Sequence, residues 1–234
     1  MTTIKPAVEL AARAAVAART EELFRASGAL REGHFQLKSG RHGDAYLEKF
    51  AVLADPAATS ELVGYWVAQV RGQAGSDEAG RRPVDLVAGP TTGGIILAFE
   101  TARQLGTLGI FAEEVADEGG GRRREFRRGF SILPGERVLL VDDILTTGGS
   151  LLAMIPAVEA LGGEIVECLV LVDRSGDRQS LTSPTTGRTY ALRTLWQLDL
   201  PTYEPGEATC PRCAAGDPLH VPGSSGTVAG TDAR

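Results

Sequence analysis

The sequence predicts an α/β protein with a central parallel sheet flanked by helices. Between residues 84 and 172, short apolar runs of strand length alternate with segments of helical length, which is the pattern of β-α-β units. Glycine-rich stretches directly follow two of the apolar runs, at 88–94 and 146–150. In an open parallel sheet, ligands bind at such strand-to-helix junctions, so we expect the functional site there.

The first part of the chain predicts two helices and a hairpin. Residues 8–26 have helical spacing, and the stretch 33–49 mixes short apolar alternation with Ser-Gly and His-Gly breaks typical of a hairpin. A second helix is expected from Pro56 to about Val70, with Asp55 as its N-cap. Residues 71–82 are polar and glycine-rich, so we expect a surface connection.

From residue 84 to residue 172 the chain alternates between predicted strands and helices. Strands are predicted at 84–88, 110–113, 138–141 and 165–172, and helices at 93–105 and 150–161. Beyond residue 200 the chain is rich in Pro, Gly and Ser, and we expect its last dozen or so residues to be disordered.

Composition excludes several classes of function. The chain of 234 residues is 43% hydrophobic and 23% charged, as is usual for a globular protein. It has no apolar run of about 18 residues, so we expect no membrane span. A net charge of −6 argues against a nucleic-acid partner. Three cysteines, an odd number, do not form a disulfide framework, and this favours the cytoplasm.

The most informative stretch is V-L-L-V-D-D-I-L-T-T-G-G-S, residues 138–150. An apolar strand runs into Asp142 and Asp143, and then into a loop of small and hydroxyl residues before a helix. Backbone N–H groups at a helix N-terminus can hold a phosphate, and carboxylates accept hydrogen bonds from vicinal hydroxyls. The combination matches a ribose 5-phosphate, and the absence of a following lysine excludes a Walker A loop. An ordinary acidic turn is the alternative interpretation.

This stretch resembles the phosphoribosyl pyrophosphate (PRPP) signature of type I phosphoribosyltransferases. Within that superfamily, G-H-F-Q-L-K-S-G-R-H at 33–42 resembles the N-terminal hood of orotate phosphoribosyltransferases, and L-V-D-R-S-G at 171–176 resembles their strand ending in an Asp-Arg pair. The segment P-T-Y-E-P-G-E-A-T-C-P-R-C at 201–213 is similar to the ending of one bacterial branch. The resemblance covers about residues 20–220.

The resemblance implies a type I phosphoribosyltransferase fold. An N-terminal helix and hood at 1–50 would form one domain with an α/β core at 51–200, followed by a C-terminal extension at 201–234. The implied activity is Mg²⁺-dependent transfer of ribose 5-phosphate from PRPP to orotate, giving orotidine 5′-monophosphate and pyrophosphate for UMP biosynthesis, in a cytoplasmic homodimer. Transfer to another nucleobase, or a weakly catalytic PRPP-binding regulatory protein, are the alternatives.

The resemblance also assigns roles to individual residues. The 5′-phosphate would be bound by Thr146, Thr147, Gly148, Gly149 and Ser150. The pyrophosphate would be bound by Gly89, Pro90, Thr91, Thr92 and Gly93. The catalytic residues would be Asp142, Asp143 and Lys38, with the two carboxylates acting through ribose hydroxyls and Mg²⁺-bound waters rather than as direct metal ligands. Arg174 would pair with a carboxylate on the base, and Tyr46 would lie against the base unless it simply packs in the core.

Two segments depart from the family pattern. Orotate enzymes carry a lysine in a mobile loop that closes over the diphosphate of the partner subunit, whereas here Glu114 stands at the expected position and no lysine follows Lys49. Cations that could replace it, with 119–121 as a hinge, are Arg122, Arg123 and Arg124. A solvent-exposed charge run explains these arginines equally well. The hood reads Ala-Tyr-Leu-Glu at 45–48, which leaves the acceptor base open.

Cys210 and Cys213 form a C-P-R-C motif, which supplies two of the four ligands of a structural zinc site. His220 or Cys168 would have to complete such a site, and a reduced turn is the interpretation that we favour. We expect the other two histidines, at 34 and 42, to pack in the hood or contact phosphate, because no metal-ligand spacing joins them.

Overall fold

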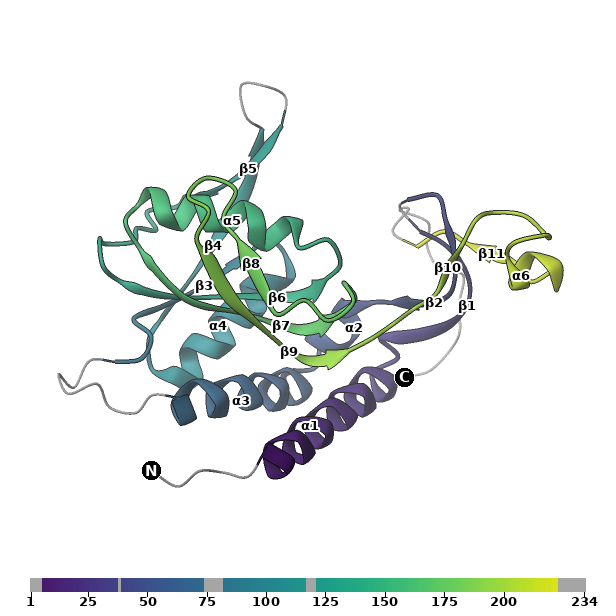
Figure 1. Ribbon diagram of the computed structural model, residues 1–234, viewed down its shortest axis with the longest axis horizontal. Helices are drawn as coiled ribbons and strands as arrows, with labels where there is room; N and C mark the ends of the chain where they lie inside the picture. The colour runs from purple at the N-terminus through teal and green to yellow at the C-terminus, as the bar shows by residue number, and fades with distance from the viewer. Residues whose placement is uncertain (1–5, 38, 74–81, 117–120, 223–234) are drawn as a thin grey trace. The chain divides into compact units, whose positions relative to one another are not determined.

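The computed structural model describes residues 6–37, 39–73, 82–116 and 121–222 (Figure 1). The chain divides into a larger unit, residues 1–28 with 49–199, and a smaller unit, residues 29–48 with 200–234. The sequence suggested a different grouping, with the hairpin beside the N-terminal helix. In the structure, the helix belongs with the core and the hairpin with the C-terminal segment. Within the described ranges, no helix has the length and apolar character needed to cross a membrane.

The larger unit is built on a seven-stranded sheet with the order β5-β4-β3-β6-β7-β9-β8. Its strands are β3 (Leu86–Pro90), β4 (Leu108–Ala116), β5 (Arg122–Phe126), β6 (Arg137–Leu145), β7 (Glu164–Asp173), β8 (Ser180–Thr182) and β9 (Thr189–Gln197). The central strands β4, β3, β6, β7 and β9 are parallel, which confirms the predicted parallel sheet. Strand β9 was not among the predicted strands. The antiparallel edge strands β5 and β8 were not predicted, because their sequences are short and polar.

Helices cover both faces of this sheet. They are α1 (Pro6–Ala26), α2 (Lys49–Leu53), α3 (Pro56–Gln73), α4 (Gly93–Leu105) and α5 (Gly149–Ala160). In Figure 1, α5 lies on one face, and α1, α3 and α4 lie on the other. Asp55 caps α3 as predicted, since its Oδ1 accepts a hydrogen bond of 2.8 Å from the Ala57 N–H.

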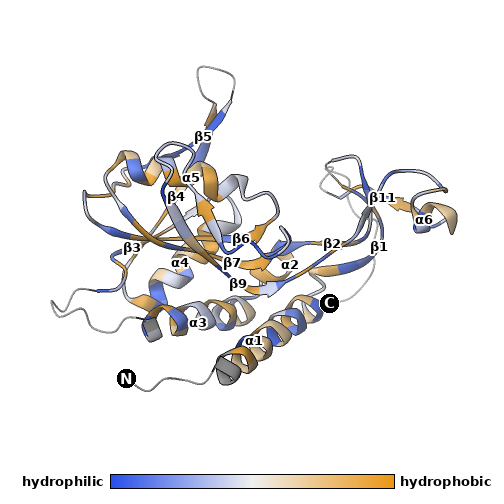
Figure 2. Cartoon of the chain, in the orientation of Figure 1, coloured by the Kyte–Doolittle hydropathy of each residue, from blue (hydrophilic) through white to orange (hydrophobic). Residues whose placement is uncertain are grey.

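Apolar residues from the sheet and α5 form the core beneath the functional loops. Leu86, Leu140 and Val170, from three neighbouring strands, are buried with Met154 and Ile155 of α5. Figure 2 shows these strands coloured as hydrophobic, in contrast to the mixed surface of α1. Successive strand residues point to opposite faces, so the residues between these apolar positions face α4 and its neighbours.

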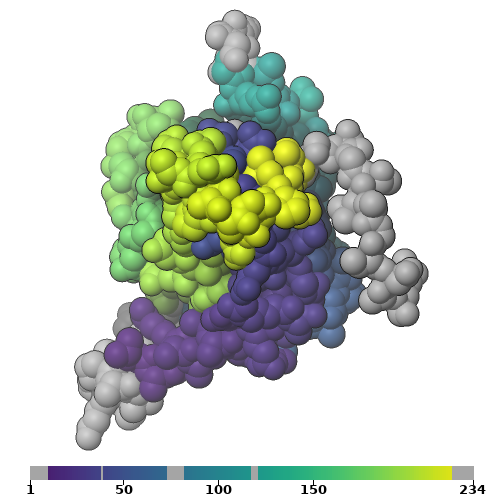
Figure 3. Space-filling model, turned by 90° about the vertical axis from the view of Figure 1, so that its right-hand side faces the viewer, coloured from purple at the N-terminus to yellow at the C-terminus, as the bar shows by residue number. Residues whose placement is uncertain are grey.

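The smaller unit is a four-stranded sheet with the order β10-β2-β1-β11. Its elements are β1 (Leu30–Gln36), β2 (His42–Leu47), β10 (Thr202–Tyr203), α6 (Pro211–Ala214) and β11 (Leu219–His220). The antiparallel β1–β2 pair confirms the predicted hairpin, and its register shifts between Glu32 and Phe35. The C-terminal segment, yellow in Figure 3, supplies a strand to each side of this hairpin.

Candidate functional site

The loop after β6 forms a hollow at the start of α5. Gly148 adopts a φ of +82°, which favours glycine, and helix α5 begins at the next residue. The hollow is lined by Asp142, Ile144, Leu145, Thr146, Thr147, Gly148, Gly149, Ser150 and Leu151. The first N–H groups of a helix have no partner within the helix, so this end of α5 favours an anion. Arg178 adds a nearby positive charge, because its Nη1 donates a 3.0 Å hydrogen bond to the Thr147 carbonyl.

The two carboxylates of the signature lie inside β6. The sequence predicted that this strand ends at Val141, but it continues to Leu145 because β7 pairs with it over that length. Asp142 and Asp143 are therefore both buried and point to opposite faces of the sheet. Asp142 lines the hollow, whereas Asp143 faces Lys49 of α2, with 2.8 Å between Oδ2 and Nζ.

Burial makes the two aspartates electrostatically different. Desolvation raises the pKa of Asp142 to about 7, and the negative charge of Asp143 contributes to this increase. A hydrogen bond from the Asp143 N–H, together with the charges of Lys49 and Arg124, opposes it. The side chain in the hollow therefore changes its charge near neutral pH, while its neighbour is held in an ion pair.

The loop after β3 is packed so tightly that only glycine fits at three positions. A Cβ atom on Gly89 would lie 2.3 Å from the Gly94 carbonyl oxygen, and one on Gly94 would lie 2.5 Å from Cδ of Pro90. A Cβ on Gly93 would lie 1.9 Å from Oδ2 of Asp143. The start of α4 therefore rests directly against the carboxylate at the end of β6, which brings the two glycine-rich loops to one edge of the sheet.

One arginine of β5 reaches this second loop. Nη1 of Arg124 donates a 2.8 Å hydrogen bond to Oγ1 of Thr91, and its Nη2 lies 3.5 Å from Oε2 of Glu114. The Arg124 side chain is only 8% exposed. A largely desolvated guanidinium beside a loop of small residues favours binding of a phosphate or diphosphate.

The other two candidate arginines point elsewhere. Arg122 and Arg123 are largely exposed and form ion pairs with Glu114 and Glu125. The sequence placed all three arginines in a loop hinged at 119–121, and this was wrong: they lie in edge strand β5. Residues 119 and 120 of that hinge lie outside the described residues.

The sequence is similar to those of known proteins. Residues 53–188 match the phosphoribosyl transferase domain family. Over 89% of its length, the chain is 41% identical to orotate phosphoribosyltransferase of Methylobacterium sp. (strain 4-46), covering 96% of that protein. It is 39% identical to that of Desulforamulus reducens, over 87% of this chain and 94% of the relative.

The chain belongs to the orotate phosphoribosyltransferase family. The crystal structure of orotate phosphoribosyltransferase from Aeropyrum pernix is similar to this phosphoribosyltransferase, with a TM-score of 0.56 and 27% identity. The match covers 76% of this chain and 92% of that one. The fold predicted from the sequence, a type I phosphoribosyltransferase fold, is confirmed.

Arg174 of this phosphoribosyltransferase follows β7 and is anchored by its backbone. Its N–H donates a 2.7 Å hydrogen bond to the Leu145 carbonyl, which connects it to the end of β6. Burial lowers the pKa of its guanidinium, with Asp199 acting in the opposite direction. Its Nε is buried and has no hydrogen-bond partner within the described parts of the chain. A buried donor without a partner is costly, so this position favours a ligand that can accept a hydrogen bond.

The structure leaves the roles of two predicted site residues untested. Lys38 lies outside the described residues. The Tyr46 ring contacts Phe35 on the neighbouring strand, with 5.6 Å between ring centroids, so packing accounts for its position.

Both partners suggested for the C-P-R-C motif were wrong. Cys168 is buried in β7, where desolvation raises the pKa of its thiol to about 12. His220 is exposed on β11 and its ring lies against Phe35. The motif instead lies beside His34 and His42, and no pattern in the sequence connects these two histidines with it.

Sequence reasoning missed two residues of the site in the larger unit. Lys49, the partner of Asp143, carries no motif, and its only signal is that lysine is rare in this chain. Arg178 is the second arginine of L-V-D-R-S-G-D-R, and only the first, Arg174, was predicted as a site residue. Both act through residues distant in sequence.

Proposed function

We propose that this phosphoribosyltransferase transfers ribose 5-phosphate from PRPP to orotate, producing orotidine 5′-monophosphate and pyrophosphate. The bond between C1 of the ribose and the pyrophosphate oxygen breaks, a bond from C1 to a ring nitrogen of orotate forms, and that nitrogen loses its proton. The observation that carries the proposal is the pair of glycine-rich loops at the ends of adjacent strands β3 and β6, with Asp142 beside one and Asp143 against the other.

Each loop would hold one end of PRPP. The 5′-phosphate suits the hollow at the start of α5, where helix N–H groups and the Thr146, Thr147 and Ser150 hydroxyls can donate. Ribose hydroxyls would then donate to Asp142, which lines the same hollow. Fixing the phosphate and the sugar orients C1 toward the base, and such positioning accounts for much of the rate of reactions of this kind.

Arg124 would stabilise the leaving group. Negative charge grows on the pyrophosphate as the C1–O bond breaks, and a desolvated cation at the Thr91 loop opposes that charge. The arginine thus supplies, from the same chain, a charge like that of the family's loop lysine.

Mg²⁺ dependence is part of the proposal, and the residues present fit the ion. Mg²⁺ prefers oxygen ligands and keeps several waters, and the carboxylate of Asp142, which lines the hollow, offers an acceptor for such waters. When bound, Mg²⁺ would neutralise the diphosphate charge. Asp142 would orient the ribose hydroxyls and the water shell, and Asp143 would fix the start of α4 and the second loop from the other face of the sheet.

Arg174 would select for the carboxylate of orotate. Its buried Nε lacks a partner in the described segments, and a guanidinium pairs well with a planar carboxylate. The roles that the resemblance gives to Lys38 and Tyr46 stay predictions.

The proposal includes a homodimer in the cytoplasm. Phe99 on α4 and Leu108 on β4 are 68% and 69% exposed, and large exposed apolar side chains on adjoining elements are typical of an interface. Light scattering on the purified chain tests the dimer. All three cysteines are free thiols, in line with a reducing compartment.

A steady-state assay with PRPP, Mg²⁺ and orotate, following the loss of orotate absorbance, tests the activity. Uracil, adenine and hypoxanthine are assayed in parallel, and each reaction is repeated with EDTA. Turnover on orotate alone at roughly 1–10³ s⁻¹ supports the proposal. Turnover on another base replaces the acceptor, and PRPP binding without turnover on any base favours a regulatory protein.

A further inference from the structure

Four metal-ligating side chains meet in the smaller unit, outside the phosphoribosyl site. They are His34 on β1, His42 on β2, and Cys210 and Cys213 at α6, and we call them the His-Cys cluster. Their ligand atoms all lie within 4.8 Å of one another. The first three side chains are buried and Cys213 is half-buried.

The distances within the His-Cys cluster match tetrahedral coordination. With Zn–S near 2.3 Å and Zn–N near 2.05 Å, sulfur and nitrogen ligands lie about 3.5 Å apart, and two nitrogens about 3.4 Å. Nε2 of His34 lies 3.6 Å from Sγ of Cys210 and of Cys213, and Nδ1 of His42 lies 3.2 Å from Sγ of Cys213. The two nitrogens are 2.8 Å apart, so binding of an ion would increase the distance between them by about 0.5 Å.

Local structure points the His34 ring at the two sulfurs. The register of β1 against β2 shifts between Glu32 and Phe35, and such a bulge redirects a side chain. Nδ1 of His34 lies 2.9 Å from the Asp217 carbonyl oxygen. Because a carbonyl only accepts hydrogen bonds, Nδ1 carries the proton, and the lone pair of Nε2 faces the cluster. This outer hydrogen bond is the usual arrangement for a metal-bound histidine.

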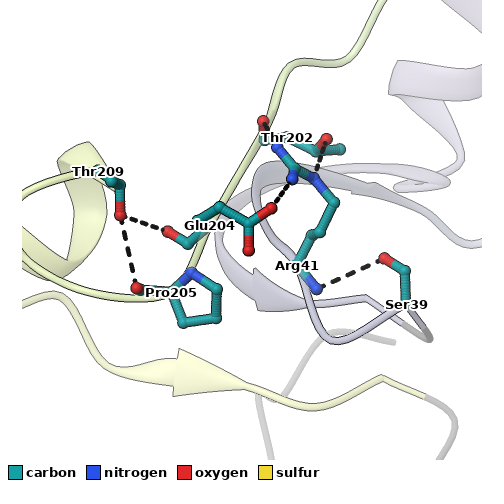
Figure 4. A network of polar contacts seen from close by, with 6 residues as sticks. All are labelled: Ser39, Arg41, Thr202, Glu204, Pro205 and Thr209. Atoms are coloured by element: carbon teal, nitrogen blue, oxygen red, sulfur yellow. Dashed lines mark hydrogen bonds and ion pairs between the residues drawn. The ribbon is translucent and has the colours of Figure 1, made fainter.

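The C-terminal segment is held in position for the two cysteines. Figure 4 shows Arg41, the residue before β2, donating two hydrogen bonds to Thr202. Its Nε lies 2.8 Å from Oγ1 of Thr202, and its Nη2 lies 2.7 Å from the carbonyl oxygen. Arg41 also pairs with Glu204. Oγ1 of Thr209 donates a 2.7 Å hydrogen bond to the Glu204 carbonyl, which orders the turn leading into Cys210.

We propose that the His-Cys cluster binds one Zn²⁺ ion, which fastens the C-terminal segment to the β1–β2 hairpin. Each thiol releases its proton as its Zn–S bond forms, so two thiolates balance the charge of the ion. Two nitrogen and two sulfur ligands in tetrahedral geometry favour zinc over Mg²⁺, which prefers oxygen.

A metal ion would supply stability that this small unit lacks. Among its described residues, the buried hydrophobic side chains are few: Ala29, Phe35, Leu47 and Cys210. Small structures with little apolar core commonly depend on metals or disulfides. The histidine–cysteine pairs that lie within 3.6 Å of each other are 171 to 179 residues apart in the chain, so one ion closes a very long loop.

Metal analysis of the untagged full-length chain, purified without chelators, tests the proposal. We expect about one zinc per chain by plasma mass spectrometry, and loss of most of it in the double variant Cys210→Ser/Cys213→Ser. His220→Ala is the matched control, because His220 is the third histidine of the chain, lies close in sequence to the motif and is outside the cluster. This variant should keep its zinc, and chelation should lower the melting temperature of the wild type.

Cobalt substitution gives a readout that needs no variant. Co²⁺ bound to the wild-type chain should show strong visible absorption from a tetrahedral site, with a thiolate-to-cobalt charge-transfer band. A chain that contains no zinc and takes up neither ion would overturn the proposal. A disulfide between the two cysteines, or equal metal loss in His220→Ala, would overturn it as well.

Discussion

The position of Arg124 leads to a quantitative prediction about the leaving group. Arg124→Gln removes one positive charge beside Thr91 and keeps much of the side-chain volume. Two unit charges 4 Å apart interact by about 4 kcal/mol at an effective dielectric constant of 20. A transition-state contribution of that size corresponds to a factor of about 10³ in rate. Because water screens part of this interaction, we expect kcat to fall by about 10²–10³ with orotate as the acceptor.

The matched control is Arg123→Gln, which removes the same charge from the adjacent residue. Arg123 pairs with Glu125 and is more than half exposed, so its loss should change kcat by less than about threefold. Both variants are assayed at saturating PRPP and Mg²⁺, after thermal unfolding shows that they are folded. Equal losses in the two variants, or a kcat for Arg124→Gln within threefold of the wild type, would refute the assignment of Arg124 to the pyrophosphate.

Three further predictions concern the two aspartates of β6 and the residues around them. Gly93→Ala places a Cβ 1.9 Å from Oδ2 of Asp143, so kcat/KM should fall at least about 10²-fold. The control is Gly64→Ala, whose added Cβ would lie 3.7 Å from its nearest neighbour, and this variant should keep both activity and stability. Lys49→Met leaves the buried Asp143 carboxylate without its cation and should lower the free energy of urea unfolding by about 1–3 kcal/mol. The loss should be smaller than for a fully buried pair, because the lysine side chain is 34% exposed. Adding Asp143→Asn to the same chain should recover most of this loss. The pKa of Asp142 is raised from 3.8 to about 7, so the folded state binds the extra proton and loses stability as pH rises through that window. Asp142→Asn should therefore flatten the decline in melting temperature between pH 5 and pH 8, and an unchanged slope would contradict the raised pKa.

The sequence predicted the parts of the fold and site that depend on local pattern. Apolar runs located β3, β6 and β7, and glycine next to hydroxyl residues located both loops. These features are readable because a buried parallel strand and a phosphate-binding turn each restrict consecutive residues. The confirmed helix from Gly93 to Leu105 shows the same, since glycine at its start and at its C-cap mark both ends.

Features that depend on distant partners could not be predicted. The R-R-R-E-F run of β5 fits a solvated loop equally well, and only its pairing with β4 shows that Arg124 is buried while Arg123 is exposed. A strand alternates its two faces, so neighbouring arginines in one charge run have different environments. The three arginines are identical in sequence, but their places in the strand leave Arg122 and Arg123 at the surface and bury Arg124 beside the second loop.

The His-Cys cluster shows the same limit for metal ligands. Sequence rules for zinc rely on ligand pairs close together in the chain, and C-P-R-C satisfies only half of such a rule. His34 and His42 are eight residues apart, and on a single extended strand two residues at that spacing would lie too far apart to bind one ion. It becomes a ligand pair because the hairpin folds back, pairs β1 with β2 and brings both imidazoles to the same place. The C-terminal segment that carries C-P-R-C also adds strands to this hairpin, and this pairing brings the two cysteines to the two histidines. When a chain contains only two cysteine ligands, the remaining ligands are therefore best sought on the strands with which that segment pairs.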